Sequence, residues 1–249
     1  MYNIDMKLGL VSAYSHNNDA HQNIKTIVKY LSENHHLDFL LFSEAFIQGF
    51  NALSWNYDID INIAIPKDSN IFNPIKEATK KYNISVGFGY YERDNKNIYC
   101  SYMIIDNCGN IINNFRRLSV GWKVVSRTNK YYQEGTKLIP FTLNNYNFMT
   151  IICGDLWDDN IKGRVIDTTL KNNIDIILWP NHLDYEIEQF NKEIDDYKER
   201  STDIKVPLLL INDHSNSSHG GAVIFKDNHI LKYLEMGNVG VLEFDTNKK

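Results

Sequence analysis

Residues 38–42 (DFLLF) restrict the fold more than any other stretch of this sequence, because the run is short and almost wholly apolar. A strand with one face in water alternates apolar and polar residues, whereas a strand covered on both faces is apolar throughout. The run therefore predicts a strand inside a sheet that has other layers on both sides. Further buried strands are predicted at residues 7–13, 174–179 and 207–212.

Apolar residues at helical spacing lie between these strands. A first helix begins near Asn18 or Asp19, and its apolar residues fall at i, i+3, i+4 and i+7. A second helix follows Ser69, a third covers residues 159–171, and a fourth precedes the strand at 207–212. The residues predicted to face inward on the first, second and fourth helices are Ile24, Ile27, Val28, Leu31, Phe72, Ile75, Thr79, Tyr82, Ile187, Phe190, Ile194 and Tyr197.

Other strand-like runs predict hairpins. Residues 98–106 and 111–115 flank the turn sequence Cys108-Gly109-Asn110, and residues 138–143 and 148–152 flank Asn144-Asn145. The run at 84–91 is a further strand, and the tail (221–225, 230–234 and 239–244) predicts a β-meander. Strands that alternate with helices and also form hairpins predict an α/β fold, with a mixed sheet or two packed sheets and the helices outside.

Size and composition narrow the class of protein. The chain has 249 residues, 43% of them hydrophobic, which fits one domain over residues 1–249. The net charge is −5 and no basic block is present, so no nucleic-acid partner is predicted. The start lacks the apolar core of a signal peptide, and no apolar run has membrane-spanning length. Three cysteines, an odd number, indicate reduced thiols and a cytoplasmic location.

Residues 147–157 (NFMTIICGDLW) place a single cysteine, Cys153, at the end of a predicted strand and before a polar turn that opens a helix. The free N–H groups and positive dipole end of a helix N-terminus stabilise a thiolate, and they can also hold an oxyanion. Cys153 is therefore a candidate nucleophile. The alternative is an inert cysteine in the core, which is common after an apolar run.

Two other strands end in charged residues. Glu44 directly follows the strand at 38–42, and Arg116-Arg117 ends the strand at 111–115. Ligand sites collect at the carboxyl ends of strands in α/β sheets, so Glu44 and Cys153 are expected to converge, with Glu44 as a general base and then a general acid. The alternatives are a surface acid or helix cap for Glu44, and a charged, protected sheet edge for the arginines.

These three strand ends, in this order, resemble the signature of the nitrilase (carbon–nitrogen hydrolase) superfamily. The glutamate motif matches at Phe42-Ser43-Glu44-Ala45-Phe46, the middle motif at residues 109–117, and the cysteine motif at residues 151–157. Residues 131–135, 176–181 and 220–224 match accompanying stretches, so the resemblance covers nearly the whole chain. The Cys-x-Asp-x-Trp form is similar to the glutaminase domains of NAD synthetases.

The resemblance implies a four-layer α-β-β-α sandwich that hydrolyses a non-peptide C–N bond, with a small-molecule amide as substrate. It implies a Cys153 thioester, Glu44 as general base and acid, and an oxyanion held by Arg117 together with the N–H of Gly154 or of the residue beyond it. It also implies that no metal or cofactor is needed, and that the protein forms a homodimer or a higher oligomer. Beside the nucleophile, Gly154, Trp157, Asn181 and His182 are expected to contact the substrate.

The sequence departs from the family pattern at two positions. Arg117 stands where the family has a catalytic lysine, and Thr128 stands where a second glutamate is frequent. Arginine keeps the positive charge, but it does not release a proton and its planar group needs more room. Lys123 is an alternative cation six residues later. The two departures leave open a nitrilase-like binding or scaffold protein with impaired catalysis.

Two further interpretations concern acidic residues and histidines. Asp158 and Asp159 are expected at a helix N-terminus, and together with Asp184 they favour a neutral or cationic amide over an anionic one. The segments around Asp155 and His182, with His214 and His219, resemble part of the metal-binding set of a metallophosphoesterase. The Asp-x-His and Gly-His-x-His pairs of that class are missing, which makes a metal-dependent phosphoesterase the weaker alternative.

Overall fold

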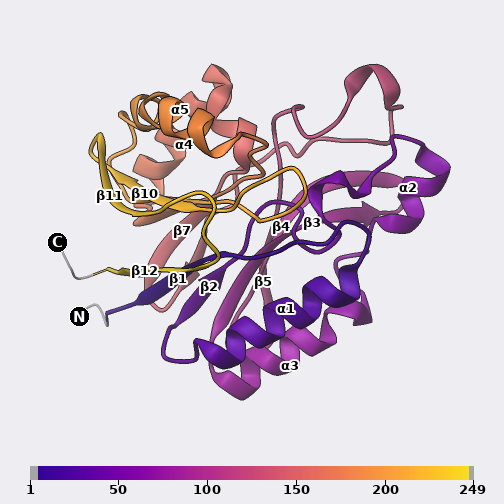
Figure 1. Ribbon diagram of the computed structural model, residues 1–249, viewed down its shortest axis with the longest axis horizontal. Coiled ribbons are helices and arrows are strands. Elements are labelled where there is room, and N and C mark those ends of the chain that lie inside the picture. The colour runs from indigo at the N-terminus through magenta and orange to yellow at the C-terminus, as the bar shows by residue number, and fades with distance from the viewer. Residues whose placement is uncertain (1–4, 247–249) are drawn as a thin grey trace.

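The computed structural model describes residues 5–246, and this part of the chain forms two six-stranded sheets packed face to face (Figure 1). The first sheet has the order β12-β1-β2-β3-β4-β5 and the second the order β11-β10-β9-β8-β7-β6. The strands of the first sheet are β1 (Lys7–Ser12), β2 (Phe39–Leu41), β3 (Ser85–Asp94), β4 (Asn97–Ile105), β5 (Ile111–Arg116) and β12 (Gly240–Asp245). Those of the second are β6 (Phe141–Leu143), β7 (Tyr146–Thr150), β8 (Ile176–Pro180), β9 (Leu208–Ile211), β10 (Ala222–Lys226) and β11 (His229–Leu234).

Helices cover the outer face of each sheet. In Figure 1, α1 (Ala20–Glu33) and α3 (Asn73–Tyr82) lie together on the outside of the first sheet, while α4 (Asp159–Lys171) and α5 (Ile187–Arg200) lie outside the second. The short helix α2 (Tyr57–Ile63) was not expected from the sequence. The result is a single-domain, four-layer α-β-β-α sandwich, which confirms the predicted fold class.

The central position of β2 follows from its three apolar residues. Phe39 and Leu41 point into the core between the two sheets, whereas Leu40 packs in the core beneath α1 and α3. The strand pairs in parallel with β1 on one side and β3 on the other. An apolar run without alternation is therefore buried on both faces, as the sequence predicts.

Helix α1 illustrates why the helical segments form where they do. Asp19 caps its N-terminus by accepting a hydrogen bond from the N–H of Gln22, which satisfies one of the free donors of the first turn. Ile24, Ile27 and Leu31 are buried against the first sheet. Helix α4 has the bounds predicted from the sequence, and its cap is Asp158.

The tail differs from the predicted meander. β10 and β11 form an antiparallel pair in the second sheet, but β12 crosses to the first sheet and pairs antiparallel with β1. Gly237, with φ of +91°, lies in the connection, and Phe244 is buried in the core between the sheets. The connection therefore links the two sheets instead of closing a hairpin. No helix in residues 5–246 has the length and apolar character needed to cross a membrane.

Candidate active site

The ends of four strands bring the candidate residues together. β2 runs parallel to both of its neighbours and β7 runs parallel to β8, and Glu44 and Cys153 each follow the end of one of these strands. His182 follows β8, and Arg117 directly follows β5 in the first sheet. Carboxyl ends of parallel strands meet at one edge of a sheet, which explains why residues far apart in the sequence share one site.

Glu44 and Arg117 form a buried ion pair. Arg117 Nη1 donates to Glu44 Oε1 over 2.7 Å, and the two side chains are 2% and 0% exposed for Arg117 and Glu44, respectively. The same oxygen accepts the thiol hydrogen of Cys100 at 3.2 Å. The other oxygen, Oε2, is buried and has no hydrogen-bond partner among the described residues. Glu44 therefore has one fully engaged oxygen and one that can take a proton.

Two glycines make room for the Arg117 guanidinium. A Cβ atom on Gly154 would overlap with Arg117 Nη2, and one on Gly121 would lie 3.0 Å from the same nitrogen. Arg117 Nε donates to Ser119 Oγ at 2.8 Å. Because these two glycines have no side chains, the guanidinium, which is wider than an ammonium group, fits at this position. Its Nη2 makes no hydrogen bond with a described residue.

Asp155 joins the loop after Arg117 to the turn that carries Cys153. Its Oδ1 accepts the N–H groups of Leu118 and Ser119 at 2.9 and 2.7 Å, and its Oδ2 accepts the N–H of Ile152 at 2.9 Å. Burial raises the pKa of Asp155 to about 6, although the Arg117 charge and these N–H donors act in the opposite direction. Asp155 is a positioning residue that sets the cation and the thiol relative to one another.

Asp155→Asn is expected to lower both activity and stability. An amide oxygen can still accept from Leu118 and Ser119, but the amide nitrogen would face the N–H of Ile152. An unpaired buried donor costs about 1–3 kcal/mol, which a urea titration at neutral pH measures. Wild-type stability and activity in this variant would contradict the positioning role.

The same variant has a pH signature. Because the pKa of Asp155 is raised, the native state binds this proton more tightly than the unfolded chain does. The part of the stability that comes from binding this proton is therefore complete below the ordinary pKa of 3.8 and is lost as the pH rises through about 6, whereas the hydrogen bonds to the three N–H groups remain at neutral pH. In the Asp155→Asn variant, the free energy of unfolding is therefore expected to change less with pH over this range than in the wild type.

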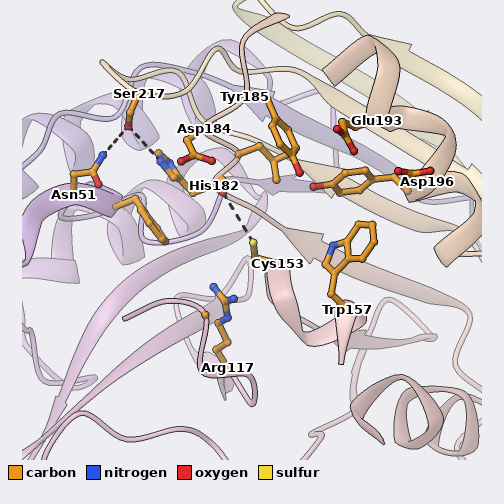
Figure 2. Close-up of a pocket in the computed structure, with 14 residues that line it drawn as sticks. Asn51, Arg117, Cys153, Trp157, His182, Asp184, Tyr185, Glu193, Asp196 and Ser217 are labelled. Carbon is orange, nitrogen blue, oxygen red and sulfur yellow. Dashed lines mark hydrogen bonds between the residues drawn. The ribbon is translucent and has the colours of Figure 1, made fainter. Parts of the chain in front are cut away.

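Cys153 occupies a strained turn. It begins a short 3₁₀ helix (Cys153–Trp157) and has φ of +40°, in the left-handed region that side chains disfavour. Its Sγ lies 4.0 Å from the backbone oxygen of His182, and its own backbone oxygen accepts from Trp179 Nε1 at 2.9 Å. These contacts hold the turn and present the half-buried thiol at the surface of a cavity (Figure 2).

The electrostatics of Cys153 differ from the sequence-based expectation. Burial, followed by the Glu44 charge, raises the pKa of Cys153 to about 12, and Arg117 only partly opposes this. The long helix α4 begins only at Asp159, so the predicted helix N-terminus is a single 3₁₀ turn. At neutral pH the thiol therefore keeps its proton and needs a base to become a nucleophile.

The cavity beside Cys153 has a volume of about 490 Å³. Arg117 and Cys153 lie at its base, and Trp157 and His182 on its walls, as Figure 2 shows. Glu44 is not in the wall, but it lies directly behind Arg117 through the ion pair. Of the predicted site residues, Glu44, Arg117 and Cys153 thus gather at one place, and Trp157 and His182 border the same space.

Gly154 and Asn181, which the sequence predicted to contact substrate, do not line the cavity. Gly154 is packed against the guanidinium of Arg117. Asn181 is fully buried, its backbone oxygen accepts the N–H of Glu44 at 3.3 Å, and its Nδ2 donates to Trp179 O at 2.6 Å. The Asn181 side chain therefore shapes the site from behind, and Gly154, which has no side chain, can contribute only its backbone N–H.

The other sequence candidates lie elsewhere. Lys123 pairs with Glu134 at 2.5 Å, and the Thr128 hydroxyl donates to backbone oxygens in its own loop. Asp158 caps α4 and Asp159 pairs with Arg200, so Asp184 alone of the three acids lines the cavity.

The histidines of the metallophosphoesterase alternative have separate contacts. The His214 ring packs against Tyr14 with centroids 4.7 Å apart, and His219 pairs with Glu186 at 3.4 Å. Among residues 5–246, no three His, Cys, Asp or Glu side chains are grouped so as to hold a metal ion.

The cavity also contains residues that sequence reasoning missed. Glu193, Asp196 and Tyr197 reach it from α5, and Asn51 and Ser217 reach it from segments outside the long helices and the strands. On α5, Asp196 and Tyr197 are three and four positions after Glu193, so the three side chains share one helix face. This spacing could have identified them from the sequence. Asn51, which lies in a short 3₁₀ helix (Phe50–Ala52), and Ser217 had no such pattern, because their positions depend on how the surrounding segments fold.

The sequence matches the carbon-nitrogen hydrolase family model over residues 7–180, so this protein belongs to the carbon-nitrogen hydrolase family. The class of protein is thus defined by both the sandwich fold and the family match.

Among curated proteins, a nitrilase of Meyerozyma guilliermondii is 34% identical over 103 residues, covering 36% of this chain and 32% of the relative. A cyanide hydratase of Penicillium rubens is 22% identical over 182 residues, covering 69% of this chain and 50% of the relative. The matched parts thus span half or less of these relatives.

Solved structures share the fold over the whole chain. An amidase from Nesterenkonia sp. superposes with a TM-score of 0.79 at 12% identity, covering 98% of this chain and 91% of the amidase. The glutamine-dependent NAD+ synthetase of Acinetobacter baumannii has a TM-score of 0.76 at 15% identity, covering 97% of this chain but 45% of the synthetase. At such identities the likeness concerns the fold.

Proposed function

We propose that this carbon-nitrogen hydrolase is an amidase that cleaves a small-molecule amide through a Cys153 thioester. The proposal rests on one observation: Arg117 contacts Glu44 at 2.7 Å and shares the base of a cavity with Cys153. An acid, a cation and a thiol are therefore assembled where a substrate carbonyl can enter. The raised pKa of the Cys153 thiol makes the nearby carboxylate necessary as a base.

In the first half of the reaction, Glu44 takes the thiol proton through Oε2 while Sγ attacks the amide carbon. The carbonyl electrons move to oxygen, and the resulting oxyanion is held by Arg117 Nη2 and the N–H of Gly154. When the C–N bond breaks, Glu44 returns the proton to nitrogen and ammonia leaves. The acyl group remains on Cys153 as a thioester.

In the second half, water replaces ammonia. Glu44 removes a proton from the water as its oxygen attacks the thioester carbon, and Arg117 again stabilises the oxyanion. The C–S bond then breaks, and the proton on Glu44 returns to the sulfur. The products are a carboxylic acid and the original thiol.

Comparisons support an amide substrate. The Nesterenkonia amidase is described with the acetamide moiety of fluoroacetamide added covalently at its active site cysteine. The curated relatives are a nitrilase and a cyanide hydratase, which makes a nitrile the alternative substrate. The Cys-x-Asp-x-Trp sequence around Cys153 favours the amide.

The test is ammonia release from a panel of small amides and the nitriles of matching carbon chain. The proposal expects ammonia from at least one amide, at a rate above that from its matched nitrile. Faster release from the nitriles would make the protein a nitrilase. Release from neither set would contradict a hydrolase and favour the binding or scaffold alternative.

The scaffold alternative has one structural observation in its favour. Arg117 and Glu44 form a buried ion pair, and in a scaffold protein this pair would serve the fold and not proton transfer by the Glu44 carboxylate. Iodoacetamide labelling separates the two cases, because Cys100 is buried and Cys108 is exposed. A Cys153 thiol that reacts no faster than Cys108 would favour the scaffold. The homodimer stays a prediction.

A further inference from the structure

The polar groups of the Cys153 cavity are divided between its two ends. Arg117 is at the base beside Cys153, whereas three carboxylates, those of Asp184, Glu193 and Asp196, lie along the opposite wall (Figure 2). None of these three carboxylates has an ion pair or a side-chain hydrogen bond within residues 5–246. The far end of the cavity is therefore negative, and no described lysine or arginine lines it.

The cations near the cavity do not neutralise these acids. Arg117 is paired with Glu44. Arg200, whose guanidinium lies 6.0 Å from the centroid of the Trp157 ring, is paired with Asp159 at 2.6 Å. His182 is 7% exposed, and its Nδ1 contacts Asp213 Oδ1 at 2.8 Å. Whether the imidazole is neutral or protonated, the pair with Asp213 carries no net positive charge. The described residues thus give the cavity an uncompensated negative charge.

His182 also has a fixed orientation, independent of the acids. Its ring stacks on Phe50 with centroids 4.2 Å apart and planes 7° from parallel. Asp213 holds Nδ1, so Nε2 is left on the side of Ser217, at 3.4 Å from its Oγ. Both ring nitrogens of His182 therefore have partners, and the buried ring forms a fixed part of the cavity wall.

Aromatic rings complete the far end. Trp157 is 43% exposed and meets the Tyr197 ring edge-to-face at 5.0 Å, and Tyr185 lies beside them. Faces of Trp and Tyr rings attract cations, and more strongly where water is partly excluded. Carboxylates together with aromatic faces are the chemistry that recognises an alkylammonium group.

We propose that the substrate of this site is an amide whose acyl chain carries a protonated amine. This inference rests on the proposed amidase function. The carbonyl lies between Cys153 and Arg117, and the ammonium group lies among Asp184, Glu193 and Asp196. A few methylene groups separate the two ends of the substrate.

Three amides of equal chain length test the charge preference: γ-aminobutyramide, pentanamide and glutaramate. They place an ammonium, a methyl and a carboxylate at the same position, and the amine is protonated at about pH 8. The expected kcat/KM for ammonia release is about tenfold higher for the cation than for pentanamide, and lowest for the anion. The preference should weaken with added salt.

Variants on one helix provide the matched control. Glu193→Gln and Asp196→Asn are expected to reduce the ratio of kcat/KM between γ-aminobutyramide and pentanamide by about threefold or more, chiefly through KM. Asp195→Asn removes the same charge from the same helix, but Asp195 bonds to Lys198 and does not line the cavity. That variant is expected to keep the wild-type ratio.

Binding to Cys153→Ala, measured by calorimetry, tests the charge preference without turnover. Tighter binding of γ-aminobutyramide than of the other two supports the inference. Equal binding of all three, or tightest binding of glutaramate, overturns it even if amides are hydrolysed. Preferential binding of the cation with no ammonia release from any amide would overturn the proposed function and leave the cation site.

Discussion

Cys153→Ala is expected to abolish ammonia release while the fold stays intact. The thiol is the nucleophile of the proposed reaction, and no other described residue of the cavity can replace it. Loss of a nucleophile lowers kcat by about 10⁴-fold or more in enzymes that act through covalent intermediates. Ammonia release from the best amide measures the loss, and urea unfolding measures the fold.

Two further variants serve as controls for this result. Cys108→Ala removes an exposed thiol in a distant turn and should keep full activity. Cys153→Gly should be as inactive as Cys153→Ala but more stable by about 1 kcal/mol, because φ of +40° strains alanine and not glycine. Ammonia release at the wild-type rate from Cys153→Ala would end the thioester mechanism.

The convergence of Glu44 and Cys153 could be predicted from the sequence because each follows a buried strand, whereas the place of Arg117 beside them was implied by the family resemblance. Strand positions depend on local patterns, such as the unbroken apolar run at β2, and the ends of parallel strands meet at one edge. The same logic failed for the tail. Leu242 and Phe244 alternate with polar residues as well in a hairpin as in a strand of the other sheet, so no local pattern shows that β12 pairs with β1.

The electrostatics of the site could not be predicted from the sequence. A turn after a strand suggested a helix N-terminus that favours a thiolate, yet burial and Glu44 raise the pKa of Cys153. Both effects come from residues distant in sequence. The contact of Asn181 with Glu44 depends in the same way on tertiary packing, because Glu44 follows a strand of the other sheet. Local sequence shows which groups arrive at the site, and packing decides their charge state and exposure.

Arg117→Met is expected to lower both stability and activity by a large amount. The change removes the cation and leaves the Glu44 carboxylate buried and unpaired, which costs about 3–5 kcal/mol of unfolding free energy. It also removes the charge that stabilises the oxyanion, with an expected fall in kcat of about 10²- to 10³-fold. Arg117→Lys keeps the charge but loses the bond to Ser119, so its activity and stability should lie between those of Arg117→Met and wild type.

The double variant Glu44→Gln with Arg117→Met separates stability from catalysis. Both buried charges are then absent, and the glutamine oxygen can still accept the thiol hydrogen of Cys100. Unfolding should therefore recover most of what Arg117→Met alone loses, whereas ammonia release should stay absent because no base remains. Additive stability losses in the double variant would show that the pair is not coupled. Restored turnover would show that neither charge takes part in the reaction.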